Sequence, residues 1–216
     1  MLSTKVKASS ITHLTDARYF AAWETEWLGF HLSPGEEYTV DVRQVSALQE
    51  WVDGVKICGE FGLSSAEDIQ TAVDLLQLDS IQVGMLTPVE TLEALAGNLE
   101  IIQEVVPEAY MSSDEIEELL QTRAGNVNYF LLNFSKGGII AEDLRSGHPY
   151  SLDQLKDWCE RYPILIDIQL DESGPKAFSE EIPVKGFAVQ GGAEEKVGYK
   201  SFDELDDFFE ALEVLV

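Results

Sequence analysis

The sequence predicts an α/β protein that folds as one compact (β/α)8 TIM barrel over residues 1–216. Short β-rich runs alternate with helical stretches from one end of the chain to the other, which is typical of a parallel sheet covered by helices. Eight strand–helix units are enough to close such a sheet, and the chain is so short that its loops must be short. A doubly wound open sheet is the alternative, but residues 9–17 lack the glycines of its first turn.

The strands are predicted from short apolar runs that are rich in β-branched and aromatic residues. They cover Lys5–Ser9, Leu28–Leu32, Val55–Phe61, Ser80–Val83, Glu100–Val106, Asn128–Asn133, Ile164–Leu170 and a strand that ends with Ala188–Gln190.

The helices are predicted from apolar spacings of three and four residues and from capping signals at their ends. Ser64 or Ser65 caps the third helix, and the SSDE segment that begins at Ser112 has capping-box chemistry. The four tryptophans, Trp23, Trp27, Trp51 and Trp158, are expected to pack between helices and barrel. The predicted helices are Thr15–Trp27, Val42–Trp51, Ser65–Leu76, Pro88–Ala96, Ser112–Thr122, Ser151–Arg161, a weak Gly174–Glu180 and Phe202–Leu215.

Composition limits the partners of the protein. The chain carries 40 acidic and 14 basic residues, a formal charge of −26, and such a surface repels nucleic acids and anionic membranes. It suits a solvated shell that serves solubility or a saline cytoplasm. Cys58 and Cys159 stand far apart without metal-ligand spacing, so neither a disulfide framework nor a metal or cofactor is expected. Without a signal peptide or an apolar stretch of about 20 residues, the expected location is the cytoplasm.

Five segments, in this order along the chain, resemble landmarks of the phosphoribosylanthranilate isomerase family. The family's counterparts are VKICGITxxEDA, LGFxFxxSPR, LDxVQLHG, a sixth strand that ends in LLD, and GxDVSSGVExxPGxK. Here they read VKASSITHLTDA at 6–17, LGFHLSP at 28–34, LDSIQVG at 78–84, YFLLN at 129–133 and GFAVQGGAEEKVGYK at 186–200. The resemblance implies a small barrel enzyme of tryptophan biosynthesis, a monomer or homodimer, that isomerises a phosphorylated sugar by an Amadori-type aldose-to-ketose reaction.

The two positions that the family uses for acid–base catalysis are changed. Its general-base cysteine falls on Ser9 and its general-acid aspartate on Asn133. A serine hydroxyl does not titrate near neutrality, and an amide cannot exchange a proton as a carboxyl does. Losing one positioned acid or base costs about 10²–10⁴ in rate. The family's activity is therefore expected to be lost or altered.

The substrate-binding positions of the family are also changed. Its arginine after SP becomes Gly35, its GGL turn after strand seven becomes residues 168–170, and its GGTG segment is reduced to residues 137–139. Only Gly191 and Gly192, in the last phosphate loop, keep a shape suited to an oxyanion.

Further candidates lie at strand ends, where barrels build their sites. Lys7 either lies near a reacting sugar, as the resemblance implies, or is neutralised by a carboxylate such as Asp167. Asp167 and Gln169 share one face of the seventh strand and would bind a polar ligand if that face meets the mouth, or hydrogen-bond to the helix layer if it does not. Gln190 and His31 are further candidate ligand-binding residues.

The segment VKICGE at residues 55–60 looks like the family's catalytic first strand, but it stands in the wrong place. The LGF strand that should follow begins 21 positions after Lys7, so VKICGE is the third strand. Cys58 is then a small core residue, or alternatively a thiol that has moved from strand one to strand three.

Three functions remain open at this stage. The first is a family-type isomerase whose mechanism is rebuilt on Cys58, Glu60, Asp167 or a histidine. The second is a non-catalytic barrel that binds a small polar ligand or a partner protein. The third is a sugar-phosphate enzyme with changed chemistry on the same barrel.

Overall fold

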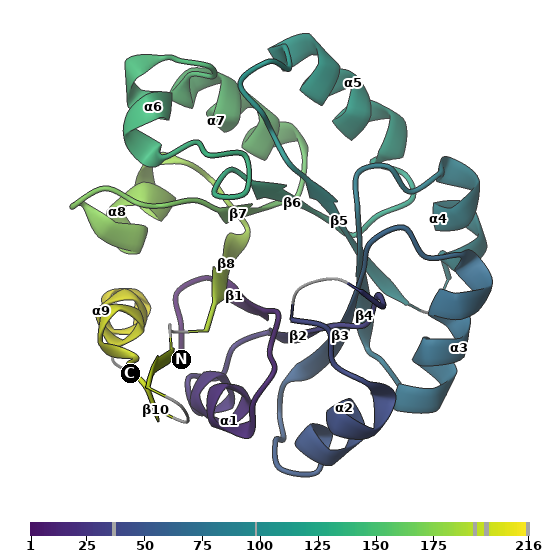
Figure 1. Ribbon diagram of the computed structural model, residues 1–216. Coiled ribbons are helices and arrows are strands. Elements are labelled where there is room, and N and C mark those ends of the chain that lie inside the picture. The colour runs from purple at the N-terminus through teal and green to yellow at the C-terminus, as the bar shows by residue number, and fades with distance from the viewer. Residues whose placement is uncertain (36–37, 98, 192–193, 197–198, 215–216) are drawn as a thin grey trace.

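The chain folds as a closed barrel of eight parallel strands with helices around it (Figure 1). This computed structural model describes residues 1–35, 38–97, 99–191, 194–196 and 199–214. The strands follow one another in chain order, and the first pairs with the eighth through five residue pairs, from Lys5 with Gly186 to Ser9 with Gln190. The predicted (β/α)8 barrel is confirmed.

The eight predicted strands and the eight predicted helices are all present and in the predicted order. The strands are β1 (Lys5–Ser9), β2 (Trp27–His31), β3 (Lys56–Phe61), β4 (Ser80–Val83), β5 (Glu100–Val105), β6 (Tyr129–Asn133), β7 (Ile164–Asp167) and β8 (Gly186–Gln190). The helices are α1 (Leu14–Ala22), α2 (Val42–Gln49), α3 (Ala66–Leu76), α4 (Val89–Leu95), α5 (Ser113–Arg123), α6 (Ala141–Ser146), α7 (Leu152–Arg161), α8 (Gly174–Glu181) and α9 (Asp203–Leu212). No helix in the described ranges is both long and apolar enough to cross a membrane.

Side-chain caps begin several helices where the sequence predicts them. The Ser65 hydroxyl accepts the Asp68 N–H at the start of α3. Ser112 and Glu115 form a reciprocal capping box at the start of α5. Each cap satisfies backbone donors that have no partner within the helix, which commonly stabilises a helix by about 1 kcal/mol.

Two short elements were not predicted. Helix α6 lies between β6 and α7, and a hairpin of β9 (Glu194–Lys196) and β10 (Tyr199–Lys200) lies between β8 and α9. The first helix was also predicted to be longer than it is. Helix α1 ends at Ala22, and Glu24 adopts a left-handed conformation with a φ of 55°.

The tryptophans are only partly as expected. Trp23 stacks on Phe209 of α9 and Trp158 is buried, but Trp51 is 64% exposed. Trp27 begins β2 and lies fully buried inside the barrel, where its indole N–H donates to Glu100 at 2.6 Å. The prediction for Trp27 and Trp51 was wrong because an aromatic residue beside a helix gives no indication of the face on which it lies.

Apolar packing holds the barrel together in two separate regions. The larger region lies between the strands and the surrounding helices, and each buried aliphatic or aromatic side chain there contributes about 1.5–3 kcal/mol. The smaller region fills the lower barrel interior and consists of Trp27, Cys58, Ile102, Leu131, Leu165 and Ala188. The interior above it is polar.

A buried ion pair lies at the centre of this polar interior. Lys7 of β1 is fully buried and donates to the carboxylate of Glu60 on β3, which is 3% exposed. Burial lowers the pKa of the Lys7 ammonium, but attraction to Glu60 outweighs this effect and leaves the pKa above its ordinary value. Gly29 of β2 makes the pairing possible, because a Cβ there would overlap the Glu60 carboxylate and lie 2.8 Å from Lys7 Nζ.

We expect Gly29→Ala to lower the free energy of unfolding by about 3 kcal/mol, since the added methyl group must separate a buried ion pair. Urea denaturation measures this loss. Gly84→Ala is the matched control, because a Cβ at Gly84 meets no atom within 4 Å. Equal stability of the two variants would show that β2 tolerates the methyl group.

Candidate functional site

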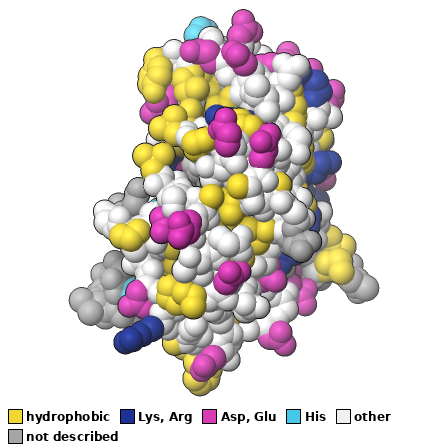
Figure 2. Space-filling model, turned by 90° about the vertical axis from the view of Figure 1, so that its right-hand side faces the viewer, with side chains coloured by type: hydrophobic (Ala, Val, Ile, Leu, Met, Phe, Trp, Pro, Cys, Tyr) yellow, Lys and Arg dark blue, Asp and Glu magenta, His cyan; other side chains and the backbone are white. Residues whose placement is uncertain are grey.

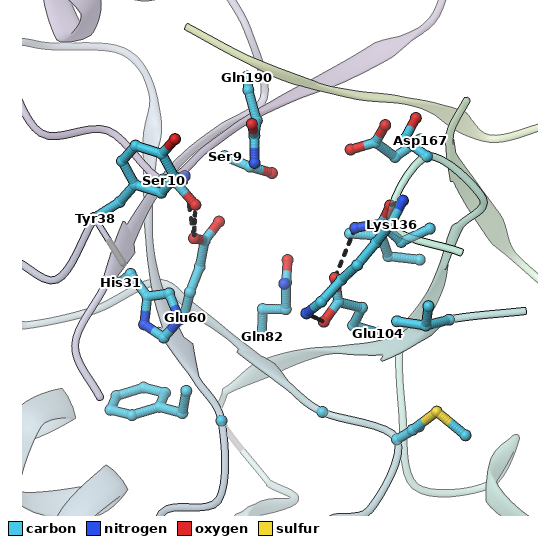
Figure 3. A pocket seen from close by; sticks show the side chains of 18 of the residues that line it. Ser9, Ser10, His31, Tyr38, Glu60, Gln82, Glu104, Lys136, Asp167 and Gln190 are labelled. Atoms are coloured by element: carbon cyan, nitrogen blue, oxygen red, sulfur yellow. Dashed lines mark hydrogen bonds and ion pairs between the residues drawn. The ribbon is translucent and has the colours of Figure 1, made fainter. Parts of the chain in front are cut away.

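A cavity of about 760 Å³ opens at the carboxyl ends of the strands, which is the position where barrel enzymes place their sites. Every strand contributes one polar side chain to its wall (Figure 3). In strand order these residues are Ser9, His31, Glu60, Gln82, Glu104, Asn133, Asp167 and Gln190.

Strand alternation and register bring these side chains to one level. Successive side chains of a strand point to opposite faces of the sheet, so the inward positions recur every second residue. The parallel register pairs Ser9 with Gln190, and Asn133 with Asp167. Polar residues are tolerated at this level because the cavity above them is open to solvent.

The hydroxyl of Ser9 lies beside the buried ion pair. Lys7 Nζ donates to Ser9 Oγ at 3.0 Å as well as to Glu60. The other Glu60 oxygen accepts the backbone N–H of Ser10 at 3.1 Å and its hydroxyl at 3.2 Å. Ser10 has a φ of 54°, a left-handed conformation that aims its N–H at the carboxylate. The end of β1 is therefore organised around Glu60.

The amide of Asn133 belongs to a second charged group across the cavity. Asn133 Nδ2 donates to Glu104 at 2.8 Å, and Asn133 Oδ1 accepts the backbone N–H of Lys136 at 2.9 Å. Lys136 Nζ lies 3.3 Å from the other Glu104 oxygen. Both ends of the amide are thus occupied, which holds the side chain in one orientation.

Asp167 differs from the other two carboxylates because it faces the cavity without an ion pair among the described residues. The side chain is half-buried. Burial raises the pKa of Asp167, and the nearby Glu104 charge raises it further, while a hydrogen bond from Ser135 and the charge of Lys7 oppose the rise. A carboxyl group with a raised pKa in a cavity is a candidate for ligand binding or proton transfer.

Most of the predicted site residues line the cavity, but Lys7 does not. Ser9, Asn133, Asp167, Gln190 and His31 all line the cavity. Lys7 lies beneath it and is neutralised by a strand-end carboxylate, as one of the two alternatives predicted, but that carboxylate is Glu60 and not Asp167.

Gln169 does not belong to the cavity wall. Strand β7 ends at Asp167, and Gln169 is exposed and bridges to Ile140. The strand alternation that predicted a shared face for Asp167 and Gln169 therefore ends before it reaches Gln169. Gly191 follows β8, and Gly192 lies outside the described residues.

Three important cavity residues were not singled out from the sequence: Gln82, Glu104 and Lys136. The first two were detectable, because each is a polar residue near the end of an apolar strand, at the inward parity. Cys58 was correctly placed in the core, and burial raises its thiol pKa to about 11, so little thiolate exists near neutrality. No three His, Cys, Asp or Glu side chains are arranged to hold a metal ion in the described part of the chain.

Solved structures that superpose on this chain include phosphoribosylanthranilate isomerases. The enzyme from Thermus thermophilus superposes with a TM-score of 0.74 at 21% identity, covering 96% of this chain and 98% of the enzyme. The enzyme from Thermotoga maritima gives a TM-score of 0.77 at 19% identity, covering 97% and 98%. The chain has the phosphoribosylanthranilate isomerase fold.

A third structure of this kind holds reduced 1-(o-carboxyphenylamino)-1-deoxyribulose 5-phosphate. It superposes with a TM-score of 0.74 at 18% identity and covers 97% of this chain and 98% of its own. No protein-family model matches the sequence, and no curated protein matches it. The relation to phosphoribosylanthranilate isomerase is therefore visible in the fold.

We expect Asp167→Asn to raise the free energy of unfolding near pH 7 by an amount on the order of 1 kcal/mol. The substitution removes a partly buried ionised carboxylate, and removing such an unfavourable group from a functional position commonly stabilises a protein. A raised pKa means that the folded state holds the proton more tightly than the unfolded state. The ionised form therefore reduces stability as pH rises above the ordinary value of 3.8. The gain should shrink as pH falls towards about 4. Urea denaturation across this range measures it.

Asp171→Asn is the control for this experiment. Hydrogen bonds from Ser173 and Arg145 lower the pKa of Asp171, so its ionised form adds stability above the ordinary pKa, and its removal should reduce stability near neutrality. A loss of stability in Asp167→Asn as well would contradict the proposed cost of burying that carboxylate.

Proposed function

We propose that this protein is a phosphoribosylanthranilate isomerase-like barrel that binds a small polar ligand in its mouth and has lost the family's acid–base isomerisation. One observation carries the proposal. Ser9 and Asn133, which stand where the resemblance puts the general base and the general acid, are both hydrogen-bonded to charged side chains, Lys7 and Glu104.

Ser9 is poorly suited to act as a base. Its oxygen accepts a hydrogen bond from the Lys7 ammonium, and a neighbouring cation makes a hydroxyl oxygen less able to accept a further proton. The serine hydroxyl also does not titrate near neutrality. Glu60, the nearest carboxylate, is occupied by Lys7 and Ser10.

Asn133 is equally unsuited to act as an acid. An amide carries no exchangeable acidic proton, and here its N–H and its oxygen are both in use. Glu104 and Lys136, which hold it, form an ion pair that is independent of any ligand. Glu104 and Lys136 thus stabilise the mouth. The amide that they hold does not replace the proton donor that the family's reaction uses.

The cavity itself supports ligand binding. Its volume lies within the range of small-molecule sites, and its wall combines polar groups with apolar ones such as Phe61 and Leu131. One isomerase of the same fold binds a reduced sugar-phosphate analogue. By the same likeness we expect this protein to work in the cytoplasm as a monomer or homodimer.

A rebuilt isomerase is the second candidate, and Asp167 is the observation that favours it. Its carboxyl has a raised pKa and stands directly beside Asn133 in the sheet register. A proton donor one strand away from the usual position would suit a changed aldose–ketose reaction or another reaction of a sugar phosphate.

We expect the protein not to restore growth of a tryptophan auxotroph that lacks phosphoribosylanthranilate isomerase. The rate of the purified protein should lie at least about 10⁴ below that of the Thermotoga maritima enzyme, because acid and base are both missing. Growth comparable to that given by the Thermotoga enzyme would overturn the proposal in favour of a rebuilt isomerase. Loss of that growth in Asp167→Asn would then identify the new acid.

Ligand binding needs a separate test. Ligand-observed NMR with a panel of amines, polyols, amino acids and sugar phosphates should detect binders whose signals disappear in Gly84→Trp. Gly84 lines the mouth, and a Cβ there meets no other atom within 4 Å, so a tryptophan side chain has room to start into the cavity without disturbing the backbone of the barrel. If no compound distinguishes the two proteins while both remain folded, the mouth is not a binding site.

A further inference from the structure

The charges that line the mouth leave one carboxylate in excess. Glu60 is paired with Lys7, and Glu104 is paired with Lys136. The third carboxylate, Asp167, has no ion pair among the described residues and faces the same cavity (Figure 3). His31 is the remaining titratable side chain of the ring at the strand ends. With both lysines engaged by glutamates, no cation in the described wall is left over to receive an anionic ligand.

A second, independent feature is a buried hydrogen-bond acceptor that the protein leaves unsatisfied. Gln82 is only 9% exposed and points into the middle of the cavity (Figure 3). Its Oε1 atom is fully shielded and has no hydrogen-bond partner among the described residues. A buried polar atom without a partner costs about 1–3 kcal/mol, so a ligand that donates to Oε1 once the Gln82 amide rotates towards the cavity gains the corresponding stabilisation.

A carboxyl group lies against Gly191, which follows β8. A Cβ placed on Gly191 would lie 3.2 Å from both Cγ and Oδ1 of Asp16. Asp16 is 2% exposed and lies in α1. Phosphate oxygens are hydrogen-bond acceptors that carry negative charge, so Asp167 in the cavity wall and Asp16 against Gly191 disfavour them.

The other side of the mouth is apolar. Phe61, Leu63, Met85 and Leu86, which follow or end β3 and β4, line the cavity. Leu63 and Leu86 are 81% and 69% exposed. A ligand of this cavity therefore meets acceptors on one side and apolar surface on the other.

The neighbouring outer face, over α3, α4 and α5, shows scattered acidic and apolar side chains with fewer basic ones (Figure 2).

The geometry points to a small organic cation as the ligand, a primary amine joined to an apolar group, with its ammonium between Asp167 and Gln82 and its apolar part against the β3–β4 side. An ammonium has three donors and no acceptor, which matches a carboxylate without an ion pair and an amide oxygen without a hydrogen-bond partner among the described residues. This inference rests on the proposed ligand-binding function and narrows it, since it excludes a phosphorylated sugar as the preferred ligand.

Titration calorimetry with three probes tests the inference. Phenethylamine and hydrocinnamate share a ring and a two-carbon chain but carry opposite charges, and ribose 5-phosphate represents the sugar phosphates. We expect phenethylamine to bind at least about tenfold more tightly than either anion. Asp167→Asn should weaken amine binding about tenfold and Gln82→Leu about fivefold, as expected for losing a charged and a neutral hydrogen bond.

Asp207→Asn on α9 is the matched control, because it removes one exposed carboxylate and leaves the cavity unchanged. It should leave the affinity for phenethylamine within about twofold, since exposed charges far from a site are screened. Weakening as large as that in Asp167→Asn would show that net charge alone attracts the amine, and would overturn the inference.

The remaining outcomes separate the two proposals. If ribose 5-phosphate binds more tightly than phenethylamine and Gly84→Trp abolishes that binding, the cation inference fails while the ligand-binding function stands. If no probe binds and the wider panel also gives no binder that Gly84→Trp removes, both fail. Unchanged amine affinity in folded Asp167→Asn contradicts the inference by itself.

Discussion

The ion pair between Lys7 and Glu60 is the interaction on which the upper half of the barrel depends. Burying either ion alone would cost several kcal/mol, so each requires the other. The pair joins β1 to β3 across β2, which is possible only because Gly29 leaves space between them. It also holds Ser9 and Ser10 through hydrogen bonds. A single pairing thus determines the packing of three strands and the chemistry at the end of the first.

The opposite side of the mouth is built on the same principle with a more exposed pair. Glu104 accepts from Asn133 and lies close to Lys136, so a second carboxylate is neutralised by the protein itself. Two groups of the mouth are not satisfied by these pairs. Asp167 has no ion pair, and the Oε1 atom of Gln82 has no hydrogen-bond partner among the described residues. Groups that are costly to leave unsatisfied and that face a cavity are typical of binding sites, where stability is reduced for function.

The fold of the protein and the side chains of its mouth belong to different parts of the barrel. It superposes over almost its full length on phosphoribosylanthranilate isomerases, and its strand ends present amides, a serine hydroxyl, a histidine, two carboxylates in ion pairs and Asp167. A barrel separates these two levels, because the helix-facing side chains hold the fold while the strand ends and loops carry the site. Substitutions at the mouth can therefore replace a reaction without weakening the scaffold.

The sequence by itself determined the barrel, its strands and most of its helices, because strand alternation, helical periodicity and caps are local patterns. It also located Ser9, Asn133, Asp167, His31 and Gln190 at the mouth, since strand ends meet there. Only the tertiary structure decided that Lys7 pairs with Glu60, that Trp27 faces the interior and that Glu104 holds Asn133. Those contacts join strands across a closed barrel, and their partners depend on closure and register, which no local pattern encodes.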